Sequence, residues 1–298
     1  MIQLQLIPLP EQVLAAFPYP ASQDIEPHEL ADLSLPPEVD LRQPIILFGQ
    51  VPQWVYGCLV NLCREVPVLA CFQASLGAAV VIHSRRADLR VGDTLPIALR
   101  SQPAPAVLVG GPPDSGKSVF SNALRLSLMR QYPQCQVYLY RANWDGEGNW
   151  SHEASNQSFV KGLVQQYERR IHEQPKAAER MRLFFEFHGE AVANLRKLVD
   201  LVIVDVGGLC QEEKQPVLEQ CTHYIVVSRD PDRIPEWRRF CEPTLEPLSL
   251  IYSVRDSTCE VLRTEPVLEV RAGPWQRGVT QAVPEEIVRV VRSILNMD

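Results

Sequence analysis

A short apolar run leads directly into a glycine-rich loop, and an apolar-periodic stretch follows it. The run covers residues 106–110, the loop reads G-x-x-x-x-G-K-S over residues 111–118, and the stretch begins at Val119. Glycines at both ends of such a loop let backbone N–H groups turn inward, where they meet the positive end of the following helix dipole. Strand, loop and helix in this order predict a cradle for a triphosphate.

The residues of this loop have distinct expected roles. Lys117 is expected to reach the β- and γ-phosphates of a nucleoside triphosphate, and the Ser118 hydroxyl is expected to hold Mg²⁺. ATP and Mg²⁺ are therefore the expected cofactors. The candidate nucleotide-binding residues are Gly111, Pro112, Pro113, Asp114, Ser115, Gly116, Lys117, Ser118 and Val119.

Composition narrows the class of protein. The chain has 298 residues, of which 46% are hydrophobic, so it can form one large core or two modest ones. Its formal net charge of −7 argues against bulk non-specific binding of nucleic acid, although not against a local basic groove. The eight cysteines form no C-x-x-C pair and are expected to be reduced, buried thiols. With no signal-peptide pattern and no long apolar stretch, we expect a soluble cytoplasmic protein without a membrane partner.

Two prolines among small residues separate two patterned regions. They lie in residues 100–106, and we divide the chain near residue 102 into domains 1–102 and 103–298. The first domain is expected to be a small mixed α/β unit. Its expected elements are strands at 45–49, 68–72 and 78–82, a helix at 52–65 and an edge strand at 93–99.

Strands and helices alternate in the second domain. This alternation predicts an α/β fold with a mostly parallel sheet, as in P-loop proteins. The expected strands are 136–141, 201–205, 224–228 and 248–253, with an edge strand at 260–270, and the expected helices lie near 155–174, 176–198 and 285–295.

Asp205 ends the most apolar of these strands and is followed by Val206, Gly207 and Gly208. A carboxylate at the tip of a buried strand beside the phosphate loop can hold Mg²⁺ through water. The two glycines allow the backbone to approach a γ-phosphate and to respond to its loss. We therefore expect Asp205 and Ser118 to share the metal, the alternative being an aspartate that only caps a turn.

Asp145 is the candidate catalytic base. It lies 28 positions after Lys117, just beyond the second strand, where a carboxylate of P-loop kinases accepts the proton of the attacking hydroxyl. Glu147 is a second candidate, and an acidic turn without catalytic role is the alternative. Trp144 and Trp150 flank this loop and are candidates either to stack on a base or to anchor the loop.

Arginines are frequent in the long helical region that follows. Arg170 is the candidate to stabilise charge on the transferred phosphate, as in the lid of many kinases. An exposed helix face is the alternative, because acidic residues lie nearby. The other arginines of this region are Arg169, Arg180 and Arg182.

Two resemblances follow from these motifs. The loop at 111–118 with Asp145 downstream resembles the RNA 5′-hydroxyl kinases of the polynucleotide-kinase and cleavage-factor type. The segments 205–208 and 229–237 are also similar to the dethiobiotin-synthetase and partitioning-ATPase branch. That branch often has an extra lysine early in its loop, where this chain has Gly110 and Gly111.

The first domain resembles the small CRISPR-associated ring-nuclease family of the Csx-three kind. The matching blocks, which follow one another without gaps in spacing, are 44–49, 52–54, 67–72, 76–81 and 89–93. The resemblance implies binding or cleavage of a cyclic tetra-adenylate messenger, or of short RNA tails, at an interface between subunits, and hence a homo-oligomer. Forms fused to a P-loop domain occur.

The chain departs from that family at the positions which carry metal binding and catalysis. Those positions hold Arg64, Gln73 and Ser75, and none of these is a good metal ligand or general base. Either the domain only binds its ligand, or His83 and Arg85 have taken over the catalytic role. We favour binding.

Together these patterns predict a type III CRISPR-associated accessory protein. Its first domain is expected to bind RNA or a cyclic oligoadenylate, and its second to use ATP and Mg²⁺ to phosphorylate a nucleotide or an RNA 5′-hydroxyl. The alternatives are an ATPase switch, a non-catalytic sensor of cyclic oligoadenylate that controls assembly, and a ring nuclease that is still active.

Overall fold

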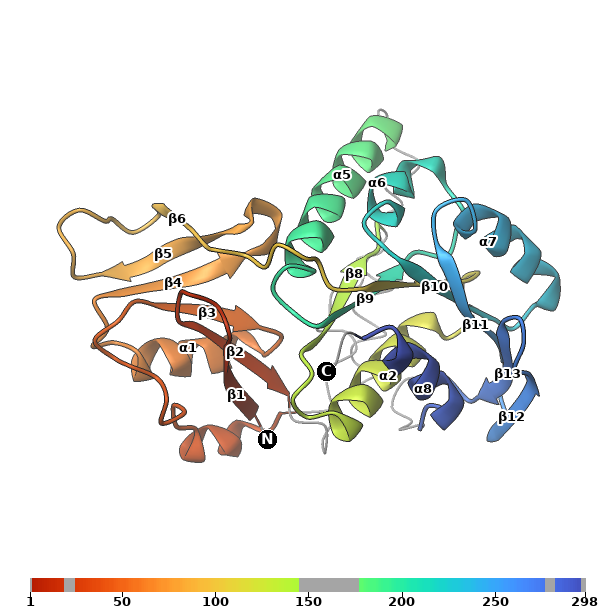
Figure 1. Ribbon diagram of the computed structural model, residues 1–298, viewed down its shortest axis with the longest axis horizontal. Coiled ribbons are helices and arrows are strands. Elements are labelled where there is room, and N and C mark those ends of the chain that lie inside the picture. The colour runs from red at the N-terminus through yellow and green to blue at the C-terminus, as the bar shows by residue number, and fades with distance from the viewer. Residues whose placement is uncertain (1, 19–24, 145–176, 277–281, 296–298) are drawn as a thin grey trace. The chain divides into compact units, whose positions relative to one another are not determined.

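The chain divides into two compact units, Met1–Pro103 and Ala104–Asp298. The computed structural model describes residues 2–18, 25–144, 177–276 and 282–295 (Figure 1). Each unit is described by itself below, as unit 1 and unit 2. Both units combine a β-sheet with helices, so the predicted α/β class is confirmed.

Unit 1 is built on a mixed six-stranded sheet with strand order β1-β2-β3-β4-β5-β6. Strands β2, β3 and β4 run parallel, and the outer pairs are antiparallel. The strands are β1 (Ile2–Ile7), β2 (Val13–Pro18), β3 (Ile45–Gly49), β4 (Val68–Gln73), β5 (Ala78–Ser84) and β6 (Thr94–Pro96), and helix α1 (Gln53–Leu62) joins β3 to β4. The elements predicted in this unit are present, and β1 and β2 are additions to the prediction.

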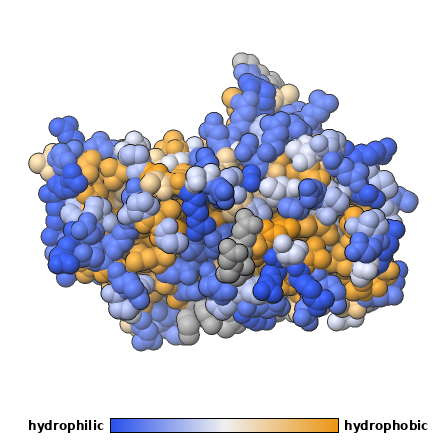
Figure 2. Space-filling view, viewed as in Figure 1, coloured by the Kyte–Doolittle hydropathy of each residue, from blue (hydrophilic) through white to orange (hydrophobic). Residues whose placement is uncertain are grey.

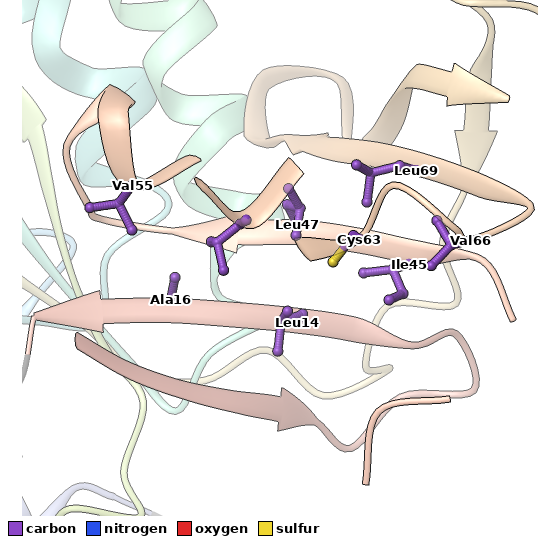
Figure 3. Packing of buried hydrophobic residues seen from close by; sticks show 9 residues of the cluster. Leu14, Ala16, Ile45, Leu47, Val55, Cys63, Val66 and Leu69 are labelled. Carbon is purple, nitrogen blue, oxygen red and sulfur yellow. The ribbon is translucent and has the colours of Figure 1, made fainter. Parts of the chain in front are cut away.

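The core of unit 1 lies between the sheet and α1. Leu14 and Ala16 of β2 and Ile45 and Leu47 of β3 point to the same side, where Val55 of α1 meets them (Figure 3). These side chains are almost fully buried. Because burying one such aliphatic side chain stabilises a fold by about 1.5–3 kcal/mol, this cluster holds helix and strands together.

Two glycines of unit 1 provide a matched stability test. Gly49 has φ of 139°, and a Cβ there would stand 1.9 Å from the carbonyl oxygen of Ala16. Gly57 lies inside α1, with open space where a Cβ would stand. We expect Gly49→Ala to destabilise the unit by about 2 kcal/mol or more, and Gly57→Ala to stabilise it by up to about 1 kcal/mol. Scanning calorimetry of the full chain checks both predictions. Equal shifts of the unfolding temperature in the two variants would contradict the stated backbone geometry.

Unit 2 is built on a seven-stranded sheet with strand order β12-β13-β11-β10-β7-β9-β8. All neighbouring strands are parallel except β12, which pairs with β13 in the antiparallel sense. The strands are β7 (Ala106–Gly110), β8 (Val137–Ala142), β9 (Leu201–Val206), β10 (His223–Ser228), β11 (Glu246–Ser253), β12 (Thr258–Arg263) and β13 (Leu268–Gly273). The predicted mostly parallel sheet is confirmed.

Helices cover both faces of this sheet. They are α2 (Lys117–Gln131), α5 (Ala177–Leu195), α6 (Gln215–Leu218), α7 (Ile234–Cys241) and α8 (Glu285–Ser293). Figure 1 shows α2 and α8 on one face and α5, α6 and α7 on the other. Right-handed crossovers explain this division, because the chain moves from β7 to β8 in one direction and returns through β9, β10 and β11 in the other.

The structure corrects one prediction about the strands of unit 2, and one predicted helix lies outside the described residues. The single edge strand predicted at 260–270 is a hairpin, in which β12 and β13 are separated near Pro266. Proline has no N–H to donate to a sheet, so the ladder is interrupted there. The helix predicted at 155–174 lies outside the described residues, and the one predicted at 176–198 is α5.

Charged and polar residues face outward in both units. In Figure 2 hydrophilic residues cover much of the visible face, with hydrophobic ones grouped between them. Among the described residues, no helix combines the length and the apolar character that crossing a membrane requires.

Candidate functional site

The glycine-rich loop connects the central strand of unit 2 to helix α2. Strand β7 is buried along its whole length and ends at Gly110, and α2 begins at Lys117. Strand β7 lies between β9 and β10, and all three are parallel. The carboxyl ends of parallel strands meet at one edge of a sheet, so the loop, the end of β9 and the end of β10 share that edge.

The loop is packed so closely that two of its positions require glycine. Gly111 has φ of 143°, and a Cβ there would stand 1.9 Å from the carbonyl oxygen of Val227. Gly116 has φ of 88°, and its Cβ would stand 2.5 Å from the Cβ of Trp275. Backbone of this kind is accessible to glycine without strain. The loop is therefore held in a curled form by β10 and by the segment after β13.

The side chain of Lys117 lies inside the loop. Its Nζ donates a hydrogen bond to the carbonyl oxygen of Pro112 at 2.7 Å, and only 8% of the residue is exposed. Burial lowers the pKa of Lys117, while the negative charges of Asp205 and Asp114 act in the opposite direction. A poorly solvated ammonium inside a glycine-rich loop favours an anionic ligand.

Asp205 lies beside the loop, as predicted, and contacts the predicted metal-binding hydroxyl. It is 2% exposed and is hydrogen-bonded to the side chain of Ser118. Burial raises the pKa of the Asp205 carboxyl. The positive charge of Arg141 opposes this most strongly, followed by the hydrogen bond from Ser118 and the charges of Lys117 and Lys214. The structure thus brings Ser118, Lys117 and Asp205 together at one site.

Arg141 is a site residue that the sequence did not reveal. Its Nη1 donates to Oδ2 of Asp205 at 3.0 Å, and both side chains are buried. The two residues stand directly opposite each other, because β8 and β9 are parallel neighbours in which position 141 pairs with position 205. The order of the strands was the missing information, since in sequence these residues are 64 positions apart.

The glycines after β9 lie against the phosphate loop. A Cβ on Gly208 would stand 2.6 Å from the backbone nitrogen of Pro113, and a Cβ on Gly207 would stand 2.8 Å from Oδ1 of Asn143. The segment is therefore in backbone contact with the place where the phosphates of a nucleotide would lie. This contact fits the expectation that its conformation depends on a terminal phosphate.

The residues present fit a nucleotide with its metal. The Oγ of Ser115 is buried and has no hydrogen-bond partner among the described residues, as expected of a group that awaits a ligand. Lys117, Arg141 and Lys214 place positive charge around the carboxylate of Asp205. No cluster of three or more potential metal-binding acids, histidines or cysteines occurs in the described part of the chain. Mg²⁺ needs none, because it is typically held by one or two protein oxygens together with phosphate and water.

Several predicted catalytic residues cannot be placed in this geometry. Asp145 and Arg170, with Glu147, Trp150 and Arg169, lie outside the described residues. Arg182 lies on an exposed part of α5 and forms an ion pair with Glu186 one turn away. This pairing favours the exposed-face interpretation for Arg182.

Trp144 is part of an aromatic cluster between β8 and α5. Its ring meets Phe184 edge to face with centroids 5.1 Å apart, and Phe184 lies 4.0 Å from His188. Nδ1 of His188 is 2.6 Å from the hydroxyl of Tyr140, and burial lowers the pKa of His188 to about 4. This histidine is therefore neutral at physiological pH. These contacts favour the interpretation of Trp144 as an anchor of its loop.

In unit 1 the residues singled out by resemblance fall into two separate places. Gln73 donates to the Oγ of Ser75 at 2.8 Å, just after β4 ends. Arg85 contacts the carbonyl oxygen of Arg64 at the other end of β4, and also pairs with Glu65. A six-residue strand spans about 20 Å, so these residues do not form one site within a single chain.

His83 is the remaining candidate of unit 1. It faces Leu69 across the β4–β5 pair, and its Nε2 is buried without a hydrogen-bond partner in the described structure. It lies toward the same end of β4 as Arg85. The structure brings no carboxylate into contact with it among the interactions described.

The strand order of unit 2, its loop and the contact between Ser118 and Asp205 define a P-loop protein of the nucleotide-binding class. A family model described as CRISPR-associated protein (Cas_csx3) matches residues 20–96. An uncharacterized protein of Aquifex aeolicus is 30% identical over 76 residues, which are 24% of this chain and 68% of that protein. By the family model over residues 20–96 and by this relative, the chain belongs to the Cas_csx3 family of CRISPR-associated proteins. The P-loop unit is the second part of the chain.

Solved structures similar to this chain are P-loop proteins of distant sequence. A plasmid partition protein from Borrelia burgdorferi bound to AMPPNP has a TM-score of 0.42 and 10% identity, covering 64% of this chain and 99% of that chain. A ParA family ATPase from Chlorobium tepidum has a TM-score of 0.38 and 12% identity, covering 63% and 81%.

Proposed function

We propose that unit 2 binds ATP with Mg²⁺ and transfers the γ-phosphate to a nucleotide or to an RNA 5′-hydroxyl. The observation that carries the proposal is the assembly of Lys117, Ser118 and Asp205 at the mouth of the glycine-rich loop. Phosphoryl transfer depends mainly on positioning and on charge neutralisation, and these residues offer both.

Different residues of the chain have different roles in phosphoryl transfer. Amides of the loop and the ammonium of Lys117 orient the phosphates and balance the charge that develops on the transferred group. Ser118 and Asp205 would hold the metal, and Mg²⁺ bound there would supply further charge neutralisation. Asp145 accepts the proton of the attacking hydroxyl, a role assigned from its place in the sequence.

A transfer assay tests this function. The full chain is mixed with Mg²⁺, ATP labelled in its γ-phosphate and a short RNA with a 5′-hydroxyl, and the same RNA with a 5′-phosphate is the control. We expect label in the first RNA alone. We also expect Asp145→Asn to lower transfer at least about 100-fold while ATP still binds. Transfer that survives this substitution would remove Asp145 as the base, and label in neither RNA would overturn phosphorylation of RNA.

A hydrolytic switch is the second candidate function of unit 2. The contact of Gly208 with Pro113 favours it, because a segment that touches the phosphate loop can report the loss of a phosphate. The same assay separates the two functions. Release of free phosphate without labelled RNA indicates the switch.

For unit 1 we propose binding of RNA or a cyclic oligoadenylate between copies of the chain, in a type III CRISPR setting. Gln73 and Ser75 lie at one end of β4, and Arg64 lies at the other, so a site that uses all three requires a second copy. Titration of the full chain with cyclic tetra-adenylate by calorimetry, with light scattering for the mass of the assembly, tests this. Linear cleavage products in mass spectrometry would overturn a purely binding role.

A further inference from the structure

A lysine outside the glycine-rich loop is almost completely buried beside the candidate site. Lys214 ends a short 3₁₀ turn at Glu212–Lys214, directly before α6, and is 2% exposed. Taking an ammonium out of water is unfavourable unless polar groups surround it. The surroundings of Lys214 therefore indicate what the residue does.

The ammonium of Lys214 is bound to the backbone of the segment that follows Asp205. Its Nζ donates to the carbonyl oxygen of Gly207 at 2.7 Å and also to the carbonyl oxygen of Leu209. Both acceptors belong to the segment Gly207–Leu209, here called the β9 loop. Lys214 thus closes this loop on itself from seven residues downstream.

The β9 loop and Lys214 are both packed against the phosphate-binding strand and loop. Nζ of Lys214 lies 5.7 Å from the ring centroid of Trp237. The same ring leaves no room for a side chain at Gly110, where a Cβ would stand 2.5 Å from it. On its other side the β9 loop touches Pro113 through Gly208. Lys214 therefore fixes the loop from one side while the P-loop bounds it on the other.

The geometry of the peptide unit links these bonds to a phosphate. The carbonyl of Gly207 and the N–H of Gly208 belong to one trans peptide and point in opposite directions. Since the carbonyl is bound to Lys214, the N–H of Gly208 points away from Lys214. A backbone N–H held in this way at the edge of the phosphate loop is a donor for the terminal phosphate of a triphosphate.

We infer that Lys214 is a positioning residue that holds the β9 loop in the conformation which recognises a terminal phosphate, and so makes the site selective for triphosphate over diphosphate. This inference rests on the proposed function, namely that unit 2 binds ATP. The charge of Lys214 also acts on the pKa of the Asp205 carboxyl, which places the ammonium within electrostatic reach of the same site.

The test compares two nucleotides in one variant. Lys214→Met keeps most of the length of the side chain and removes its charge. Lys197→Met is the control, at a half-buried lysine outside the site. Calorimetric titrations of the full chain with Mg²⁺ use a non-hydrolysable ATP analogue and ADP. We expect Lys214→Met to weaken binding of the ATP analogue at least tenfold and binding of ADP less than twofold. We expect Lys197→Met to change neither affinity.

A second variant keeps the inference testable if Lys214→Met fails to fold. Lys214→Gln removes the positive charge and shortens the donor that reaches the carbonyl oxygens of Gly207 and Leu209, and we expect it to show the same selective loss. Equal weakening of both nucleotides in the folded variants, or no weakening of either, would overturn the role of Lys214 while the proposed function stands. A wild-type chain that binds neither nucleotide would overturn both.

Discussion

Lys117→Met is expected to lower phosphate release or transfer from ATP at least about 100-fold. The ammonium of Lys117 lies within the loop, 2.7 Å from the carbonyl oxygen of Pro112. Under the proposed function it would balance negative charge on the β- and γ-phosphates. Methionine fills nearly the same volume but offers no charge and no donor. The measurement is the γ-phosphate assay with the full chain, and Lys197→Met is the control variant.

The stability of the nucleotide-free variant distinguishes lost chemistry from lost folding. Burial lowers the pKa of Lys117 in the folded chain, so the unfolded chain binds the proton more strongly. The positive charge of this lysine therefore opposes folding below its folded pKa, and stability rises with pH through the window between that pKa and 10.5. We expect Lys117→Met to remain at least as stable as the wild type near neutral pH and to lack this rise. A variant that is inactive because it is unfolded would contradict this prediction.

The local sequence was sufficient to predict the phosphate-binding element. Residues 106–118 contain within themselves the apolar strand and the glycines that permit the curl, and the structure has both where the sequence predicts them. The strand predicted at 201–205 was equally clear, because its apolar run lies between Asp200 and the glycines at 207 and 208. Interactions over short sequence distances account for both.

Contacts between distant parts of the chain were not predictable in the same way. Arg141 meets Asp205 only because β8 and β9 are neighbours in the sheet, and Lys214 gains its role from a loop that folds back on the chain. In unit 1 the alternation of Ile2–Ile7 fits a strand, yet only pairing with β2 explains why it is stable at the edge. Predicting these features requires the order of strands, which the hydrophobic pattern does not contain.

The resemblance of unit 1 indicated its family but not a working site. The positions that correspond to the catalytic set hold Arg64, Gln73 and Ser75, and within one chain they lie at opposite ends of a strand. A matching spacing of motifs describes which residues align and does not show which of them meet. Whether aligned residues meet depends on contacts between distant parts of the chain, which the spacing of motifs does not contain.

Asp205→Asn is expected to uncouple nucleotide binding from Mg²⁺. In the wild type, Asp205 is hydrogen-bonded to Ser118 and would share the metal with it, so Mg²⁺ should strengthen binding of a non-hydrolysable ATP analogue. In the variant the amide is a poor ligand for this hard cation. We expect the strengthening of analogue binding by Mg²⁺ to fall at least about tenfold, as measured by calorimetry. We expect phosphate transfer to fall at least about 100-fold, as measured by the labelled-phosphate assay.

The pH dependence of stability provides an independent readout for the same variant. Burial raises the pKa of Asp205 above 3.8, so the folded chain binds this proton more strongly than the unfolded chain does. The wild type therefore loses stability from this group as pH rises from 3.8 to its folded pKa, and Asp205→Asn has no such loss. The free energy of unfolding of the variant, relative to the wild type, should increase with pH over this window in nucleotide-free buffer. A decrease instead would mean that the ion pair with Arg141, rather than burial, dominates the ionisation of Asp205.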